Sequence, residues 1–339
     1  MKLKNLRMSR RTLLAGAGAT IAATGLAMPS IVRAQTPVRI GYLHTLAVDG
    51  QIWLADHMGE WEKQELAPEF IQFTTGLEIF QAMIGGSIDV LATGAVISNF
   101  PARGEGKAFL MNNVERATAQ LWVNPDAGVS SFEDLRGQSI STTTGTTAHV
   151  FLDRALRANG IIPGQDVELI NQRMSDAVTS FISGAVPAVA LWVPFNISVR
   201  ENLPDARMLV DASQFYPEAA IMGGWATTDS YIESNREVLE RIVKAWAPAN
   251  EFLREAPDEA LPILQANHYP NVPLADLTEQ YQAQEMFSVE EWENMYEDGT
   301  VENWLQQVTD FYVEAGGITN PVPASEYLVS DIFFNAVRG

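Results

Sequence analysis

A turn rich in threonine is the part of the sequence whose residue types most directly suggest a chemical task. Residues 142–147 are five threonines and Gly145, between a predicted strand over 139–142 and a predicted helix over 147–158. The first N–H groups of a helix have no partner inside the helix, and its N-terminus carries roughly half a positive charge. Thr144, Gly145, Thr146 and Thr147 could therefore hold an oxyanion without a basic side chain. An ordinary helix N-cap uses the same residue types, so the turn alone leaves both interpretations open.

Further candidates follow the predicted strands of the first half of the chain, because open α/β sheets bind ligands at the carboxyl ends of their strands. The first strand is followed by a predicted loop over 43–51. The candidates at these strand ends are His44, Gln51, Thr75, Gly76, Gly94 and Ala95. Threonine and glycine at such places are equally typical of plain turns.

Four aromatic side chains could form the apolar wall of a small-molecule pocket. They are Trp122, Trp192, Phe195 and Trp225. Trp192 ends a predicted strand, and Phe195 follows just beyond it. Tryptophan is highly buried on average, so core packing remains the alternative for each tryptophan.

The elements that must position these residues occur twice in the same order. Strands predicted over 38–42, 69–73 and 88–92 alternate with helices over 51–58 and 77–84, and strands over 139–142, 167–170 and 186–192 alternate with helices over 147–158 and 175–182. Ile40, Gly59 and Gly86 correspond to Ile140, Gly160 and Gly184, at offsets of 100, 101 and 98 residues. This alternation predicts two similar α/β lobes with a cleft between them. Residues 229–339 are predicted to be mostly helical, without a sheet of their own.

Composition argues against several classes of function. The 339 residues include 22 Lys and Arg against 42 Asp and Glu, and the formal net charge of −20 repels the phosphates of nucleic acids. The chain has no cysteine, and its four histidines are too scattered for a His-rich metal motif. The common hydrolase and phosphate-loop motifs are also missing. We therefore expect no catalytic residue, no metal, no cofactor and no nucleic-acid partner.

Residues 1–34 have the pattern of an export signal. They hold six basic residues and no acidic one, followed by a mildly apolar stretch. The paired Arg10 and Arg11 favour the twin-arginine route, with an ordinary secretion signal as the alternative. Val32 and Ala34 suit the small-residue rule, so we expect cleavage after Ala34 and delivery to the periplasm. Cleavage would leave a net charge of −26, and no later segment is long and apolar enough to span a membrane.

With these features together, the sequence resembles the extracytoplasmic solute-binding proteins of ATP-driven (ABC) importers, in the branch associated with nitrate, taurine and alkanesulfonates. The resemblance covers nearly the whole chain after residue 34 and depends on five short segments in a fixed order. The segments are RIGY at 39–42, GSIDV at 86–90 with Gly94-Ala95, SFEDLRGQ at 131–138, GTTAH at 145–149 and WVPF at 192–195. The resemblance implies a periplasmic binding protein type II-like fold, in which two α/β lobes with mixed sheets enclose a ligand cleft and the chain has two hinge crossovers.

The resemblance also implies lobe limits, site residues and partners. Lobe 1 is expected over 35–122 and 224–339, and lobe 2 over 123–223. Gly145, Thr146, Thr147 and His149 correspond to a segment that lines the ligand site in relatives, where His149 could donate to an anion or only pack. The implied ligand is a small organic anion, and the implied partners are the membrane permease and ATPase subunits of an importer. We expect a monomer that catalyses no reaction.

One position departs from the family pattern. Many relatives place an acidic residue between the Trp and Pro of WVPF, where it can pair with an amine on the ligand, but this chain has Val193. That difference favours an anion with an apolar or uncharged body over taurine. An aromatic heterocycle of the pyrimidine kind, stacked on Trp192 and Trp225, is the alternative ligand. A receptor for a sensor kinase and an enzyme of the same fold, such as the pyrimidine synthases with their cysteine-rich motif, are the alternative functions.

Overall fold

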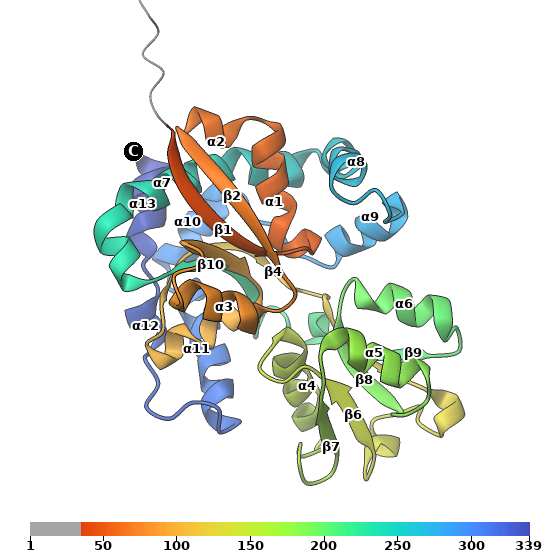
Figure 1. Cartoon of the computed structure of the whole chain (residues 1–339). Helices are drawn as coiled ribbons and strands as arrows, with labels where there is room; N and C mark the ends of the chain where they lie inside the picture. The colour runs from red at the N-terminus through yellow and green to blue at the C-terminus, as the bar shows by residue number, and fades with distance from the viewer. Residues whose placement is uncertain (1–34) are drawn as a thin grey trace, which may run out of the picture. The chain divides into compact units, whose positions relative to one another are not determined.

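The computed structural model describes residues 35–339, which contain two five-stranded sheets (Figure 1). The first sheet has the strand order β2-β1-β3-β10-β4 and the second has the order β7-β6-β8-β5-β9. The strands of the first sheet are β1 (Thr36–Leu43), β2 (Leu66–Phe73), β3 (Val90–Thr93), β4 (Lys107–Val114) and β10 (Met222–Thr227). The strands of the second sheet are β5 (Ala119–Val123), β6 (Ser139–Thr142), β7 (Glu168–Asn171), β8 (Ala188–Trp192) and β9 (Arg207–Asp211). The predicted export signal over 1–34 lies outside the described residues.

The same strand and helix unit builds both sheets. β1 pairs in parallel with β2 and β3, and β6 pairs in parallel with β7 and β8. The helices of these units are α1 (Leu46–His57), α3 (Gly76–Ile84), α4 (Thr147–Ala158) and α5 (Met174–Ile182). Parallel strands in such units are covered on both faces, which is why β3 and β8 are almost wholly buried and rich in apolar residues. The prediction of two similar α/β lobes is confirmed, and α4 has the predicted bounds.

Two antiparallel pairings complete each sheet and make it mixed, as the family resemblance implies. β10 lies antiparallel between β3 and β4, and β5 lies antiparallel between β8 and β9. Residues 115–118 connect β4 to β5, and residues 212–221 connect β9 to β10; we call them the first and second crossings. The predicted lobe limits need a correction, because 119–122 pair along β5 in the second sheet and 222–223 pair along β10 in the first.

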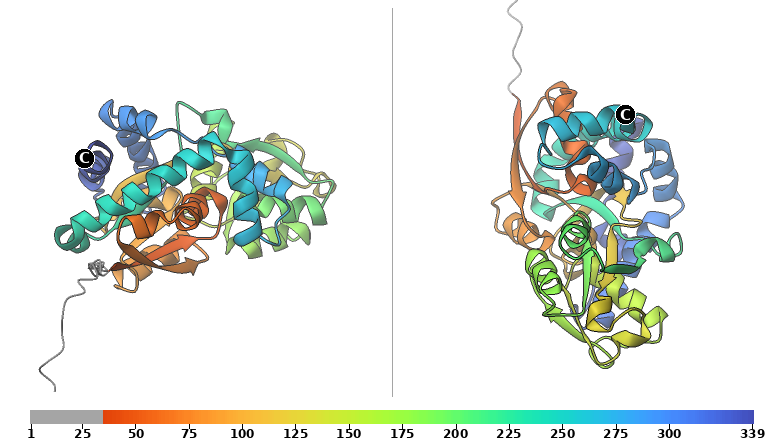
Figure 2. Two further views of the ribbon diagram at one scale, coloured as in Figure 1. Left: turned by 90° about the horizontal axis from the view of Figure 1, so that it is seen from above. Right: turned by 90° about the vertical axis from the view of Figure 1, so that its right-hand side faces the viewer.

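The segment 229–339 is mainly helical, as predicted. Its helices are α7 (Asp229–Glu255), α8 (Pro257–Asn267), α9 (Leu274–Gln282), α10 (Val289–Glu297), α11 (Thr300–Glu314), α12 (Ala324–Tyr327) and α13 (Ser330–Arg338). α7 packs on α1 and α13, and Figure 2 shows it lying across α1. α9 ends at Gln282, because the backbone of Glu285 instead pairs with Val114 at the end of β4.

The remaining helices are short. α2 (Glu60–Lys63) follows α1, and α6 (Phe195–Asn202) follows β8. Of the helices in the described range 35–339, none is long and apolar enough to cross a membrane.

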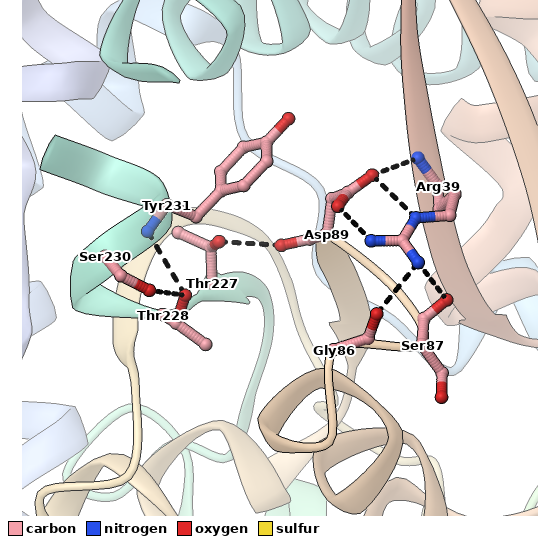
Figure 3. Close-up of polar contacts among 8 residues, drawn as sticks. All are labelled: Arg39, Gly86, Ser87, Asp89, Thr227, Thr228, Ser230 and Tyr231. Carbon is pink, nitrogen blue, oxygen red and sulfur yellow. Dashed lines mark hydrogen bonds and ion pairs between the residues drawn. The ribbon is translucent and has the colours of Figure 1, made fainter. Parts of the chain in front are cut away.

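Asp89 ties the central strands of the first sheet together (Figure 3). Its carboxylate accepts hydrogen bonds from the backbone N–H of Arg39 at 2.8 Å, from Nε of Arg39 at 3.1 Å and from Nη2 at 2.6 Å. The Nη1 group of Arg39 donates to the carbonyls of Gly86 and Ser87, and the Thr227 hydroxyl donates to the carbonyl of Asp89 at 2.7 Å. These contacts hold the turn before β3 against β1 and β10, so the RIGY and GSIDV segments have a structural role here.

Candidate ligand-binding site

A pocket lies between the two lobes, at the ends of strands from both sheets. The first lobe contributes Leu43, Thr45, Ala47, Val48, Gly76, Thr93, Gly94 and Val96, and the second contributes Thr146, Thr147, Trp192 and Val193. Glu115 and Thr118 of the first crossing complete the lining. The cavity volume is about 40 Å³, so the pocket is narrow in this arrangement of the lobes.

Five of the residues selected from the sequence line this pocket together. They are Gly76, Gly94, Thr146, Thr147 and Trp192. A sixth, Ala95, contacts it through its backbone, because its N–H donates to Thr147 Oγ1 at 3.2 Å. Ala95 opens the short helix η1 (Ala95–Ser98), so this bond joins the first lobe to the start of α4 in the second.

The N-terminus of α4 presents free backbone donors at the pocket. Thr146 is the N-cap residue, with extended backbone and no side-chain cap bond, and its hydroxyl donates to the carbonyl of Thr143 at 2.6 Å. Within residues 35–339, the backbone N–H groups of Thr146, Thr147 and Ala148 have no hydrogen-bond partner. Such groups, with the positive end of the helix dipole, favour a negatively charged or carbonyl oxygen at this position.

Glu115 is a site residue that the sequence did not reveal. It is 6% exposed, and its oxygens accept hydrogen bonds from Thr118 Oγ1 at 2.9 Å and from Thr147 Oγ1 at 3.3 Å. Burial disfavours the charged carboxylate and raises the pKa of Glu115 to about 7. Among the 14 described residues that line the pocket, Glu115 is the only ionisable one. No local motif marks this residue, because its place depends on where the chain passes between the sheets.

Gly76 and Gly94 line the pocket at positions where no larger residue fits. A side chain at either position would collide with another site residue. A Cβ on Gly94 would lie 2.2 Å from Glu115 Oε1, and a Cβ on Gly76 would lie 2.6 Å from Thr93 Oγ1. The Thr93 hydroxyl is buried and has no hydrogen-bond partner in the described structure. The two glycines therefore do more than form turns, since they leave room for polar groups at the pocket wall.

His44 and Gln51 do not line the pocket, because the predicted loop over 43–51 is wrong. α1 begins at Leu46, after Thr45 as an extended N-cap residue, so most of the segment is helical. The Gln51 side chain is buried and donates to the carbonyl of Asn112 at 3.2 Å. The His44 ring lies beside the pocket, with Nδ1 2.6 Å from a carboxylate oxygen of the buried Asp49 in the first turn of α1.

Thr75 and Thr144 line a different, more open pocket that also includes Asn171 and Arg173. Thr75 is the N-cap residue of α3 and its hydroxyl accepts from the N–H of Glu78 at 3.2 Å. The N–H of Thr144 donates to Asn171 Oδ1 at 3.0 Å. For these two threonines, the structure shows the ordinary turn and cap roles that the sequence left open.

Gly145 and His149 contact α11 rather than the pocket. Gly145 has a positive φ of 80°, and its N–H donates to His149 Nδ1 at 3.1 Å, so this ring nitrogen acts as an acceptor. The imidazole packs edge-on against Phe311, and burial lowers the pKa of His149. Tyr312 also donates to the carbonyl of Gly145 at 3.1 Å. Of the two roles left open for His149, the structure places it in packing.

The four aromatic candidates separate into wall and core. Trp192 lines the pocket and packs edge-on against Phe195 with ring centroids 5.7 Å apart, while Val193 lines the pocket beside it. Trp122 is buried in the core of the second lobe, where its Nε1 donates to Gln120 Oε1 at 2.8 Å. Trp225 is only 1% exposed in the core of the first lobe. Trp225 was therefore a wrong choice for the pocket wall, because the central position of β10 buries it.

Polar contacts also join the lobes at two places beside the pocket. Arg173 at the start of α5 donates to Glu78 of α3 at 3.1 Å. Arg200 and Asn196 of α6 both donate to Glu279 Oε1 of α9, at 2.6 Å and 2.8 Å. Each contact pairs a residue of the second lobe with one of the first, so both respond to any change in the angle between the lobes.

Comparisons with known proteins agree with this architecture. The family model described as "NMT1/THI5 like" matches residues 101–260. A protein of Brucella abortus named as a binding protein is 28% identical over 330 residues, covering 96% of this chain and 99% of the relative. The taurine-binding periplasmic protein of Escherichia coli is 26% identical over 190 residues, covering 55% of this chain and 58% of that protein.

Solved structures share the fold. The alkanesulfonate-binding protein SsuA from Xanthomonas axonopodis, bound to MOPS, aligns with a TM-score of 0.72 at 17% identity, covering 87% of this chain and 98% of that one. The periplasmic nitrate-binding protein NrtA from Synechocystis aligns with a TM-score of 0.73 at 13% identity, covering 90% and 89%. The chain therefore shares its fold with the alkanesulfonate- and nitrate-binding proteins and is similar in sequence to the taurine-binding periplasmic protein.

Proposed function

We propose that this protein is the periplasmic receptor of an ABC importer and captures a small organic anion, of the alkanesulfonate, taurine or nitrate kind, between its two lobes. The observation that carries the proposal is the α4 N-terminus at the interlobe pocket, where free backbone N–H groups can bind an oxyanion without a basic side chain. The names of the relatives and structural neighbours support the same ligand class.

The proposed mechanism is closure of the lobes around the ligand. Trp192 and Thr147 belong to the second lobe, and Gly94 and Val48 to the first, so one ligand can contact both sides only when the lobes approach each other. A ligand that binds better to the closed arrangement shifts the population toward it. The closed form would be presented to the permease and ATPase subunits of the importer, and no bond of the ligand would be broken. We propose that the receptor acts as a monomer after twin-arginine export and cleavage at Ala34.

A second ligand class is an aromatic heterocycle of the pyrimidine kind. One observation favours it, namely that Trp192 and Glu115 line the same pocket. The indole can stack on an aromatic ring, and the carboxylate can accept hydrogen bonds from ring or amino N–H groups.

Thermal unfolding with a ligand panel tests the proposal. The purified protein, freed of carried-over ligand by unfolding and refolding, is heated with alkanesulfonates, taurine, nitrate, aromatic carboxylates and pyrimidines. A ligand that binds only the native state stabilises it by about 2.7 kcal/mol at a hundredfold excess over Kd. We expect sulfonates or related anions to raise the melting temperature, less strongly in Thr146→Ala. Thr179→Ala is the matched control, since this exposed threonine also donates to a backbone carbonyl, at 2.8 Å. A response to uncharged heterocycles alone, unchanged in Thr146→Ala, would contradict the anion site.

A further inference from the structure

Among the described residues of the pocket wall, Glu115 is the only ionisable one, and its negative charge is unfavourable for a site that binds nothing but an anion. The chain carries no Lys, Arg or His among the described residues that line the pocket. A plain anion at the start of α4 would lie near Glu115, because Thr147 both opens that helix and donates to Glu115 Oε1. Two like charges at such a place disfavour each other strongly when water is excluded.

The hydrogen bonds of Glu115 leave acceptor capacity unused. Each carboxylate oxygen receives one hydroxyl donor, Thr118 on Oε2 and Thr147 on Oε1. An ionised carboxylate can accept about four hydrogen bonds. A buried carboxylate without a cation or enough donors is costly to keep, and burial accordingly raises the pKa of Glu115 to about 7. A ligand that brings a donor would satisfy the unused positions.

The surroundings of Glu115 also favour contact with a ligand over a purely structural role within the first crossing. Gly94 has no side chain, and any Cβ there would lie 2.2 Å from Glu115 Oε1, so the pocket side of the carboxylate is kept clear. The buried hydroxyl of Thr93 lines the same pocket and has no partner in the described part of the chain, which is a second sign of an absent polar ligand.

We propose that Glu115 is a specificity-determining residue of this pocket and that the ligand places a nitrogen with N–H donors, such as an ammonium or amino group, against its carboxylate. This inference rests on the proposed receptor function and makes it narrower. The ligand is an amino-substituted small molecule whose oxygen-bearing end meets the α4 N-terminus and whose carbon body packs near Trp192. Many relatives have an acidic residue at the position of Val193, where it can pair with an amine of the ligand. In this protein Glu115 supplies that carboxylate instead.

Matched ligand pairs test the inference in the full-length purified protein by calorimetric titration at pH 8, where Glu115 is mainly ionised. The pairs are taurine and 2-hydroxyethanesulfonate, 3-aminopropionate and 3-hydroxypropionate, and aminopyrimidine and methylpyrimidine. We expect the amino member of at least one pair to bind at least tenfold more tightly than its partner. In Glu115→Gln this preference should fall below threefold, because the amide has no charge to pair with an ammonium.

Two controls keep a folding defect apart from a loss of specificity. Glu290→Gln removes one carboxylate from an exposed position on α10 and should leave the amino preference unchanged. Glu115→Asp keeps the charge and should retain part of the preference, whereas a purely structural role would lower the affinity for both members of each pair alike.

The outcomes separate this inference from the proposed function. Binding of amino-free sulfonates as tightly as taurine, or an unchanged preference in Glu115→Gln, would overturn the role of Glu115 and leave the anion receptor intact. Binding of aminopyrimidine alone, lost in Glu115→Gln, would overturn the anion receptor and support Glu115. Binding of no probe would overturn both.

Discussion

Gly94 and Glu115 are so close that the two positions cannot both carry ordinary side chains. A Cβ built on Gly94 lies 2.2 Å from Glu115 Oε1 and 2.9 Å from Thr147 Oγ1. Gly94 directly follows β3, and Glu115 directly follows β4, so the contact joins a loop of the first lobe to the first crossing. The backbone of the first lobe thereby sets the position of the one carboxylate in the pocket.

Gly94→Ala should damage binding more than stability. The added methyl group must displace Glu115 and Thr147, so we expect ligand affinity to fall by at least tenfold in titration. Gly128→Ala is the control, because Gly128 has a positive φ of 80° and open space around it. That change should cost about 1 kcal/mol of unfolding free energy by backbone strain and leave affinity unchanged. Equal affinity in Gly94→Ala and the wild type would mean that Glu115 moves aside freely.

The buried carboxyl of Glu115 should make the stability of the protein depend on pH. Its pKa rises from 4.5 to about 7 on folding, because burial disfavours the charge. Between these values the native state binds more protons than the unfolded state, so the free energy of unfolding falls as pH rises. Above pH 7 the loss from this group amounts to roughly 3 kcal/mol.

Glu115→Gln should remove that loss, since the amide is neutral at every pH. Urea unfolding of the variant and the wild type should give similar free energies near pH 4.5, and the variant should be more stable above pH 7. Comparing the variant with the wild type at each pH cancels the contributions of other titratable groups. Asp49 is one such group, since burial also raises its pKa. A difference that stays constant from pH 4.5 to 8 would show that Glu115 is not buried as a charge.

The repeat and the helical tail could be predicted from the sequence, because they depend on local patterns. Apolar strands, helix periodicity and glycine stops recur at a spacing of about a hundred residues, and they give the parallel half of each sheet. The antiparallel strands were missed because their pairing depends on distant segments. β10 contains Gly223 and Gly224, which weaken any local strand signal, and it becomes a central strand only between β3 and β4.

The site could be predicted only in part, for the same reason. The threonine turn, Gly94 and Trp192 follow strands, and their place at the cleft follows from the general rule for open α/β sheets. Glu115 lies in the first crossing, whose position becomes visible only when β4 and β5 are assigned to different sheets. His44 was misplaced because its neighbours Thr45, Ala47 and Val48 line the pocket, whereas its ring is held against Asp49 of α1.

The ion pairs between the lobes should tune closure. Arg200→Ala removes the ion pair of α6 with Glu279 of α9 but leaves the hydrogen bond from Asn196, and Arg173→Ala removes the ion pair with Glu78 of α3; Figure 1 shows these helices. Exposed pairs of this kind contribute about 0.2–1 kcal/mol, so we expect each change to weaken ligand binding by at most about fivefold. The loss should shrink at high salt, which screens the wild-type pairs.

Small-angle X-ray scattering of the ligand-free protein checks the closure prediction. Both variants should have a larger radius of gyration than the wild type if the pairs favour lobe contact. Arg157→Ala is the control, because its partner Asp153 lies one turn away on the same helix α4, with a nitrogen–oxygen distance of 2.8 Å. An equal effect of Arg157→Ala would assign the change to general stability.

Two tryptophans should separate ligand contact from core packing. Trp192 lines the pocket, whereas Trp225 is 1% exposed in β10. Trp192→Ala should weaken ligand binding by at least tenfold with a small change in melting temperature, because it removes pocket wall rather than core. Trp225→Ala should cost about 3–5 kcal/mol of unfolding free energy, as large-to-small changes of buried aromatic residues do.

Trp225→Phe keeps most of the core volume, and the Nε1 that it removes has no hydrogen-bond partner within residues 35–339. It should therefore fold and bind the ligand like the wild type. Weak binding in Trp225→Phe together with normal binding in Trp192→Ala would reverse the two assignments and place the ligand elsewhere.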